Sequence, residues 1–81
     1  PAAAFAKSPN MPENVPYAVK VRCDTLKQKF DAASAHPKNP AELDAAREAA
    51  SQGGALCRAS KYEEGGDSLA RALRLIGESA D

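Results

Sequence analysis

Apolar residues return at helical spacing in three separate stretches of this 81-residue chain. In the first stretch, steps of four and three residues connect Val19, Cys23, Leu26, Phe30 and Ala33, which is the pattern of one helix face. No stretch shows the alternation of apolar and polar residues that a half-buried strand requires. The spacing therefore predicts an all-α chain.

Prolines and a glycine set the limits of the helices. We expect helices over about 16–34, 40–58 and 61–77. Pro16 and Pro40 suit a first helical turn, where the missing N–H has no intrahelical partner to lose. Pro37 ends the first helix because a residue before proline is pushed out of helical geometry, and Gly77 is a natural C-terminal stop for the third.

The second helix has a face of almost entirely small residues, namely Leu43, Ala46, Ala50, Gly53 and Cys57. Small side chains allow two helix axes to approach closely. The adjacent Gly53 and Gly54 cost about 1 kcal/mol each relative to alanine, so we expect either a kink or close packing that compensates. Asn39 occupies the N-cap position, with Glu42 three residues later as in a capping box.

Short connections between three helices predict a small antiparallel three-helix bundle, forming a single domain over 16–79. Residues 1–15 precede it and are expected to form a flexible or extended N-terminal arm, because prolines and asparagines interrupt any apolar period there. Within this arm, Ala4-Phe5-Ala6 is similar to a small-x-small signal cleavage site. The arm is thus either the remnant of a signal cleavage region or an alanine-rich disordered tail.

The two cysteines, Cys23 and Cys57, lie 34 positions apart and both fall on predicted core faces. In an antiparallel bundle they meet near the distal ends of the first two helices, and a bridge there stabilises by roughly 3–4 kcal/mol. The alternatives are two buried free thiols or a redox pair, although the C-x-x-C spacing of redox pairs is absent. A structural disulfide and the possible cleavage site predict a periplasmic or secreted protein.

Charge and composition exclude several classes of function. Eleven basic and eleven acidic residues cancel, which argues against a nucleic-acid partner. No apolar run approaches the ~20 residues of a membrane span, so no membrane insertion is expected. The one histidine, His36, lies in a proline-rich turn and is expected to be solvated. We expect no metal site, no cofactor and no catalytic residue set, and therefore no enzyme.

The C-terminal half of the chain has small and aromatic residues at the intervals of a known helical repeat, namely Gly53, Leu56, Ser60, Tyr62, Gly65, Leu69 and Ala72. Over 46–79 it resembles a single tetratricopeptide-type repeat, with Lys61-Tyr62-Glu63-Glu64 at the turn into the second helix. Gln52 stands where that family usually has leucine, and no second copy follows. The resemblance implies a helix hairpin that binds a protein or peptide.

One stripe of the second helix carries Arg47, Ser51, Gly54 and Arg58. In the family resembled, the first helix of a repeat lines the ligand groove, so this stripe is the candidate partner-binding site for an acidic peptide or carboxylate. The alternative is two solvated arginines at a helix edge. Residues 15–39 also hold five basic and two acidic residues, an excess that either complements the acidic C-terminal half or steers a partner.

Two functions follow from these observations. The first is a small exported helical protein that acts as a protein or peptide interaction module or as an accessory subunit. The second is a small periplasmic stress chaperone (holdase), which would lose compactness between about pH 2 and 4 as its carboxylates protonate. A homodimer that completes the modest apolar core is compatible with both functions.

Overall fold

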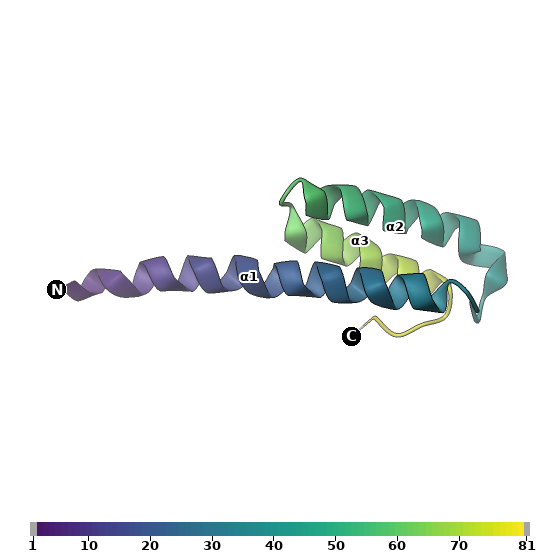
Figure 1. Cartoon of the computed structure of the whole chain (residues 1–81), viewed down its shortest axis with the longest axis horizontal. Helices are drawn as coiled ribbons and strands as arrows, with labels where there is room; N and C mark the ends of the chain where they lie inside the picture. Colours follow the sequence, from purple (N-terminus) through teal and green to yellow (C-terminus); the bar gives the residue numbers. More distant parts are fainter. Residues whose placement is uncertain (1, 81) are drawn as a thin grey trace.

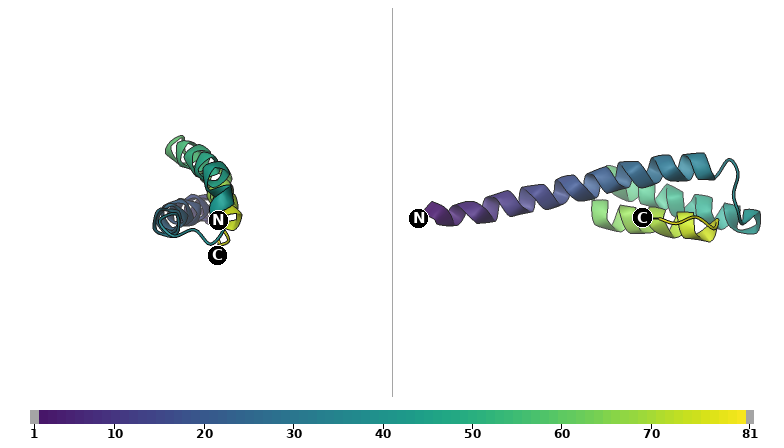
Figure 2. Two further views of the ribbon diagram at one scale, coloured as in Figure 1. Left: turned by 90° about the vertical axis from the view of Figure 1, so that its right-hand side faces the viewer. Right: turned by 90° about the horizontal axis from the view of Figure 1, so that it is seen from below.

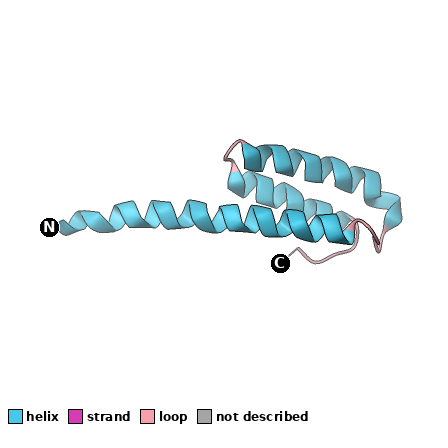
Figure 3. Ribbon diagram, in the orientation of Figure 1, coloured by secondary structure: helices cyan, strands magenta, loops and turns pink. Residues whose placement is uncertain are grey.

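Three helices account for most of the protein (Figures 1 and 3). This computed structural model describes the backbone of residues 2–80 and the side chains of residues 17–80. The elements are α1 (Ala2–Ala33), a 3-10 turn η1 (Pro40–Glu42), α2 (Leu43–Arg58) and α3 (Tyr62–Leu75). No strand occurs between residues 2 and 80. The predicted all-α, three-helix architecture is confirmed, and the second and third helices end within two residues of the expected limits.

The second and third helices form an antiparallel hairpin, and α1 runs alongside it (Figure 1). An end-on view shows that α1 packs on one side of the hairpin, where it contacts α3 much more than α2 (Figure 2). The α3 helix is therefore the central element, in contact with both of the others. The whole molecule measures 58 × 20 × 14 Å, and α1 gives it this elongated form.

The first helix begins much earlier than the sequence pattern indicates. We expected a flexible or extended arm over residues 1–15, and in the structure the backbone of residues 2–15 is helical and continues α1 beyond the hairpin. The segment is an arm in the sense that it projects from the bundle (Figure 1). The residues before Pro9 are rich in alanine, the best helix former, whereas Pro9, Pro12 and Pro16 each remove a backbone hydrogen-bond donor from α1.

The core consists of aliphatic side chains and alanines. Its largest fully buried side chains are Leu26, Leu69, Leu73 and Ile76. Three of these four belong to the end or the body of α3, which explains why that helix lies at the centre. Phe30 adds an aromatic ring from α1, and α2 contributes Ala46 and Ala49. The small alanines of α2 let the hairpin close tightly, at the expense of buried apolar area.

Two glycines bring the backbones of α2 and α3 into contact. A Cβ atom at Gly53 would lie 2.8 Å from the carbonyl oxygen of Gly65 and 2.8 Å from Cγ of Leu69. A Cβ at Gly65 would lie 2.8 Å from the carbonyl oxygen of Gly53. Of the two outcomes expected for the glycine pair in the second helix, close packing is therefore the correct one, and α2 is continuous from Leu43 to Arg58.

The two hairpin helices end in the same hydrogen-bonded arrangement, a Schellman motif. At the end of α2, Lys61 N–H donates to the carbonyl oxygen of Leu56 at 2.8 Å, and Ser60 has a positive φ of 67°. At the end of α3, Glu78 N–H donates to the carbonyl oxygen of Leu73 at 2.9 Å, and Gly77 has φ 89°. The predicted stop at Gly77 is thus confirmed, while Ser60 adopts the same left-handed geometry with a side chain.

The capping box expected at Asn39 does not form. Asn39 precedes η1, but its side chain makes no capping hydrogen bond there. Its Nδ2 instead donates to the carbonyl oxygen of Leu75 at 3.2 Å, and its backbone N–H donates to the carbonyl oxygen of Ile76 at 3.1 Å. The carbonyl oxygens at the end of a helix lack intrahelical hydrogen-bond donors. The Asn39 side chain therefore bonds to the end of α3 and does not cap the short turn η1.

Replacing each of the adjacent glycines of α2 by alanine separates close packing from helix propensity. Gly53→Ala should lower the free energy of unfolding by about 1–3 kcal/mol, because its Cβ meets backbone atoms that cannot move independently. Gly54→Ala is the matched control: its Cβ meets only Nη1 of Arg58, at 3.4 Å, so it should gain about 0.5–1 kcal/mol. Urea unfolding measures both, and equal effects would contradict the assigned contact.

Ser60→Gly should stabilise the protein by about 0.5–1 kcal/mol, because only glycine adopts positive φ without steric cost. Gly77→Ala, at the equivalent position after α3, should destabilise it. The midpoint of thermal unfolding, followed by the helical circular-dichroism signal, reports both changes. A lower midpoint for Ser60→Gly would mean that the serine side chain stabilises the turn.

Candidate functional site

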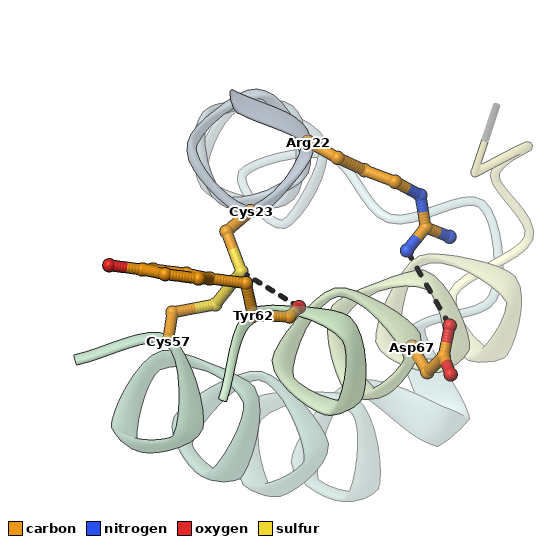
Figure 4. Close-up of polar contacts among 5 residues, drawn as sticks. All are labelled: Arg22, Cys23, Cys57, Tyr62 and Asp67. Carbon is orange, nitrogen blue, oxygen red and sulfur yellow. Dashed lines mark hydrogen bonds and ion pairs between the residues drawn. A yellow bond between two sulfur atoms is a disulfide. The ribbon is translucent and has the colours of Figure 1, made fainter. Parts of the chain in front are cut away.

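A disulfide joins Cys23 of α1 to Cys57 of α2, close to the turn between α2 and α3 (Figure 4). The two Cα atoms are 6.4 Å apart, and the bond closes a separation of 34 positions. Cys23 is 2% exposed, whereas Cys57 is half-buried. The structural bridge predicted from the two core faces is present, and neither cysteine is a free thiol.

The start of α3 completes the surroundings of the bridge. Sγ of Cys23 lies 3.3 Å from the carbonyl oxygen of Tyr62, the first residue of α3 (Figure 4). A disulfide sulfur carries no proton, so this is a close contact and not a donated hydrogen bond. Gly65 supplies the space on the other side, since a Cβ there would lie 2.5 Å from Sγ of Cys57. All three helices therefore meet at the disulfide.

Beside the disulfide lies a groove of about 370 Å³ between α1 and α2, with α3 beneath it. Its lining combines apolar groups with charged side chains from facing helices: Lys20, Cys23, Asp24, Lys27, Gly54, Cys57, Arg58, Tyr62 and Leu69. Three of these residues are cationic and one is acidic, so the groove has a net positive charge. A concave site with an apolar floor and a few charged groups is suited to a ligand that carries both kinds of surface.

Gly54, in the groove lining, leaves space for the guanidinium of Arg58. Gly54 has no side chain, and Nη1 of Arg58 lies 3.4 Å from the place a Cβ would take. The guanidinium thus folds back over Gly54, one helical turn from its own Cα. From α1, Lys20 and Lys27 line the same groove two turns apart.

The structure brings together two of the four residues that the sequence marks as a binding stripe. Gly54 and Arg58 line the groove, whereas Arg47 and Ser51 are exposed on α2 outside it. The sequence did not single out Lys20 and Lys27, which α1 adds from across the groove. The signal for them was the excess of basic residues over 15–39, a signal that gave no indication of which cations face α2.

A second and smaller groove, of about 280 Å³, lies on the opposite helical face of α2. It is lined by Glu42, Ala45, Glu48, Ala49, Gln52, Arg71 and Leu75. Its acidic residues outnumber its single arginine, so it has the opposite charge to the groove beside the disulfide. The two sides of α2 therefore present different electrostatic surfaces.

Two ion pairs at the surface join segments that are distant in the sequence. Arg22 of α1 pairs with Asp67 of α3 at 3.5 Å, and Lys38 pairs with Glu78 at 3.8 Å (Figure 4 shows the first pair). Both pairs are solvated, so each contributes at most about 1 kcal/mol. His36 is exposed in the turn after α1. Among the residues with described side chains, no three His, Cys, Asp or Glu side chains gather closely enough to hold a metal ion.

Comparison with known proteins leaves the family open: no family model, curated protein or solved structure matches this chain. Across the described part of the chain, no helix is both long and apolar enough to cross a membrane.

Removing the bridge should cost about 3–4 kcal/mol of unfolding free energy in the Cys23→Ala, Cys57→Ala double variant, because the unfolded chain regains the entropy of a 34-residue loop. Urea unfolding of the double variant beside the oxidised wild type measures this loss. A loss below about 1 kcal/mol would show that α1 stays on the hairpin through core packing alone.

Proposed function

We propose that this protein is a small exported interaction module, and that the cationic groove beside the disulfide binds an acidic segment of a partner protein. The observation that carries the proposal is the composition of the groove. Lys20, Lys27 and Arg58 converge from two helices on a concave surface whose floor includes the disulfide and Leu69.

The ligand chemistry follows from those groups. A guanidinium can bind a carboxylate through two parallel hydrogen bonds, and an ammonium attracts it as a point charge. The apolar floor favours an uncharged side chain next to the carboxylate, because covering apolar area releases water. Asp24 is the single acidic group of the groove lining, and it would repel a ligand carboxylate placed next to it.

Two further features support an exported binding protein. The disulfide suits an oxidising compartment such as the periplasm or the extracellular space. The antiparallel pairing of α2 and α3 suits the resemblance to a tetratricopeptide-type hairpin over 46–79, a family that binds peptides. Under this proposal the protein has no catalytic role and acts as an accessory subunit or adaptor.

Binding is best tested by titrating the oxidised protein with a short acetylated peptide in which glutamates flank a leucine. Amide chemical shifts should move around Gly54, Arg58 and Tyr62, and binding should weaken as salt increases. Arg58→Glu and Lys27→Glu should each weaken binding by about tenfold or more, since each replaces an attraction by a repulsion.

Arg47→Glu is the matched control, because it makes the same charge change on the same helix outside the groove. It should change binding less than about twofold, mainly through screened long-range charge. A peptide with glutamines in place of the glutamates should bind much more weakly. Equal binding of the two peptides, or an equal loss with Arg47→Glu, would refute the proposed site.

A further inference from the structure

The two cysteines of the disulfide are not equally exposed. Cys23 is 2% exposed, and its Sγ lies against the carbonyl oxygen of Tyr62. Cys57, which forms the α2 side of the bridge (Figure 4), is half-buried and is part of the groove lining. Both cysteines line the groove, and the more exposed Cys57 is the one that we assign as the target of a thiol there.

The charge of the groove decides which thiols are favoured there. Thiol–disulfide exchange requires a thiolate, which is an anion, and nearby cations raise the fraction of thiolate. Lys20, Lys27 and Arg58 surround the approach to Cys57, with Asp24 as the only opposing charge of the lining. A thiol with additional negative groups gains a second attraction, to the cations that would hold an acidic segment.

We propose that Cys57 is a thiolation site for small thiols with a net negative charge, such as glutathione. This proposal rests on the proposed function, because it uses the same cationic groove. The thiolate attacks Sγ of Cys57 and forms a mixed disulfide with it. The Cys23–Cys57 bond breaks, and its electron pair leaves on Sγ of Cys23. That sulfur takes up the proton that the attacking thiol released, so no further oxidant or reductant is consumed.

The carbonyl oxygen beside Cys23 stabilises the product. At 3.3 Å from Sγ, the carbonyl oxygen of Tyr62 can accept a hydrogen bond from the new thiol, whereas it repels a thiolate. The adduct on Cys57 occupies the groove and places its carboxylates against the lysines. Thiolation thus frees α1 from its covalent link and blocks the binding site for an acidic segment, and a reversal of the exchange restores both.

The test uses the oxidised full chain and three thiols that differ in charge: mercaptoethanesulfonate, 2-mercaptoethanol and cysteamine. Each rate on the native protein is divided by the rate of the same thiol on the protein unfolded in urea, which removes the intrinsic reactivity of the thiol. At low salt, this ratio should be about tenfold or more higher for the anionic thiol than for the cationic one, and the difference should shrink at high salt.

The site of attachment is read by mass spectrometry after free thiols are blocked with N-ethylmaleimide. The adduct should lie on Cys57 and the blocking group on Cys23. The variant with Lys20→Gln and Lys27→Gln should lose most of the preference for the anionic thiol. Lys29→Gln, on α1 outside the groove, is the control that should keep it.

Equal ratios for the three thiols, or an adduct mainly on Cys23, would overturn the inference. So would a reaction rate that does not depend on thiol concentration, because unfolding would then be limiting. Peptide titration of the same variants keeps the two ideas apart. Charge-selective thiolation without peptide binding would refute only the proposed function, and peptide binding without selective thiolation would refute only the thiolation site.

Discussion

The backbone contact between α2 and α3 at Gly53 and Gly65 positions everything else in this small protein. Each glycine leaves room for the carbonyl oxygen of the other, and Gly65 also leaves room for Sγ of Cys57. The hairpin can therefore close tightly and still hold a sulfur atom next to the turn that joins α2 to α3. A side chain at either position would push α3 away from α2, and the disulfide would lose its place above the start of α3.

A central α3 explains why a groove exists at all. Because α1 packs mainly on α3, it has fewer contacts with α2, to which the Cys23–Cys57 bridge joins it covalently. The space between α1 and α2 then remains open to solvent, with α3 as its floor. Cations from both helices line that space, which gives this molecule of zero net charge a concave surface of positive charge.

The elements of the fold were largely predictable, because they depend on neighbouring residues. The helical spacing around Leu26 sets the buried face of one helix, and Pro37 and Gly77 stop helices. Each of these effects extends over only one or two helical turns. The sequence predicted an arm over residues 1–15 but not the helical backbone of residues 2–15, because Pro9, Pro12 and Pro16 are local signals against a helix. The cap expected from Asn39 was wrong, because its partner is a carbonyl 36 positions away.

By itself, the sequence determined the class of the fold and the approximate limits of the second and third helices, since periodicity requires nothing beyond the chain's own order, and it favoured a bridge between its two cysteines. Only the tertiary structure decided which charged residues share a surface. Arg58 and Lys27 are 31 positions apart and belong to helices whose rotation is set by packing on α3, so no local pattern could place them together. The same packing left Arg47 outside the groove, although it lies on the same helix as Arg58.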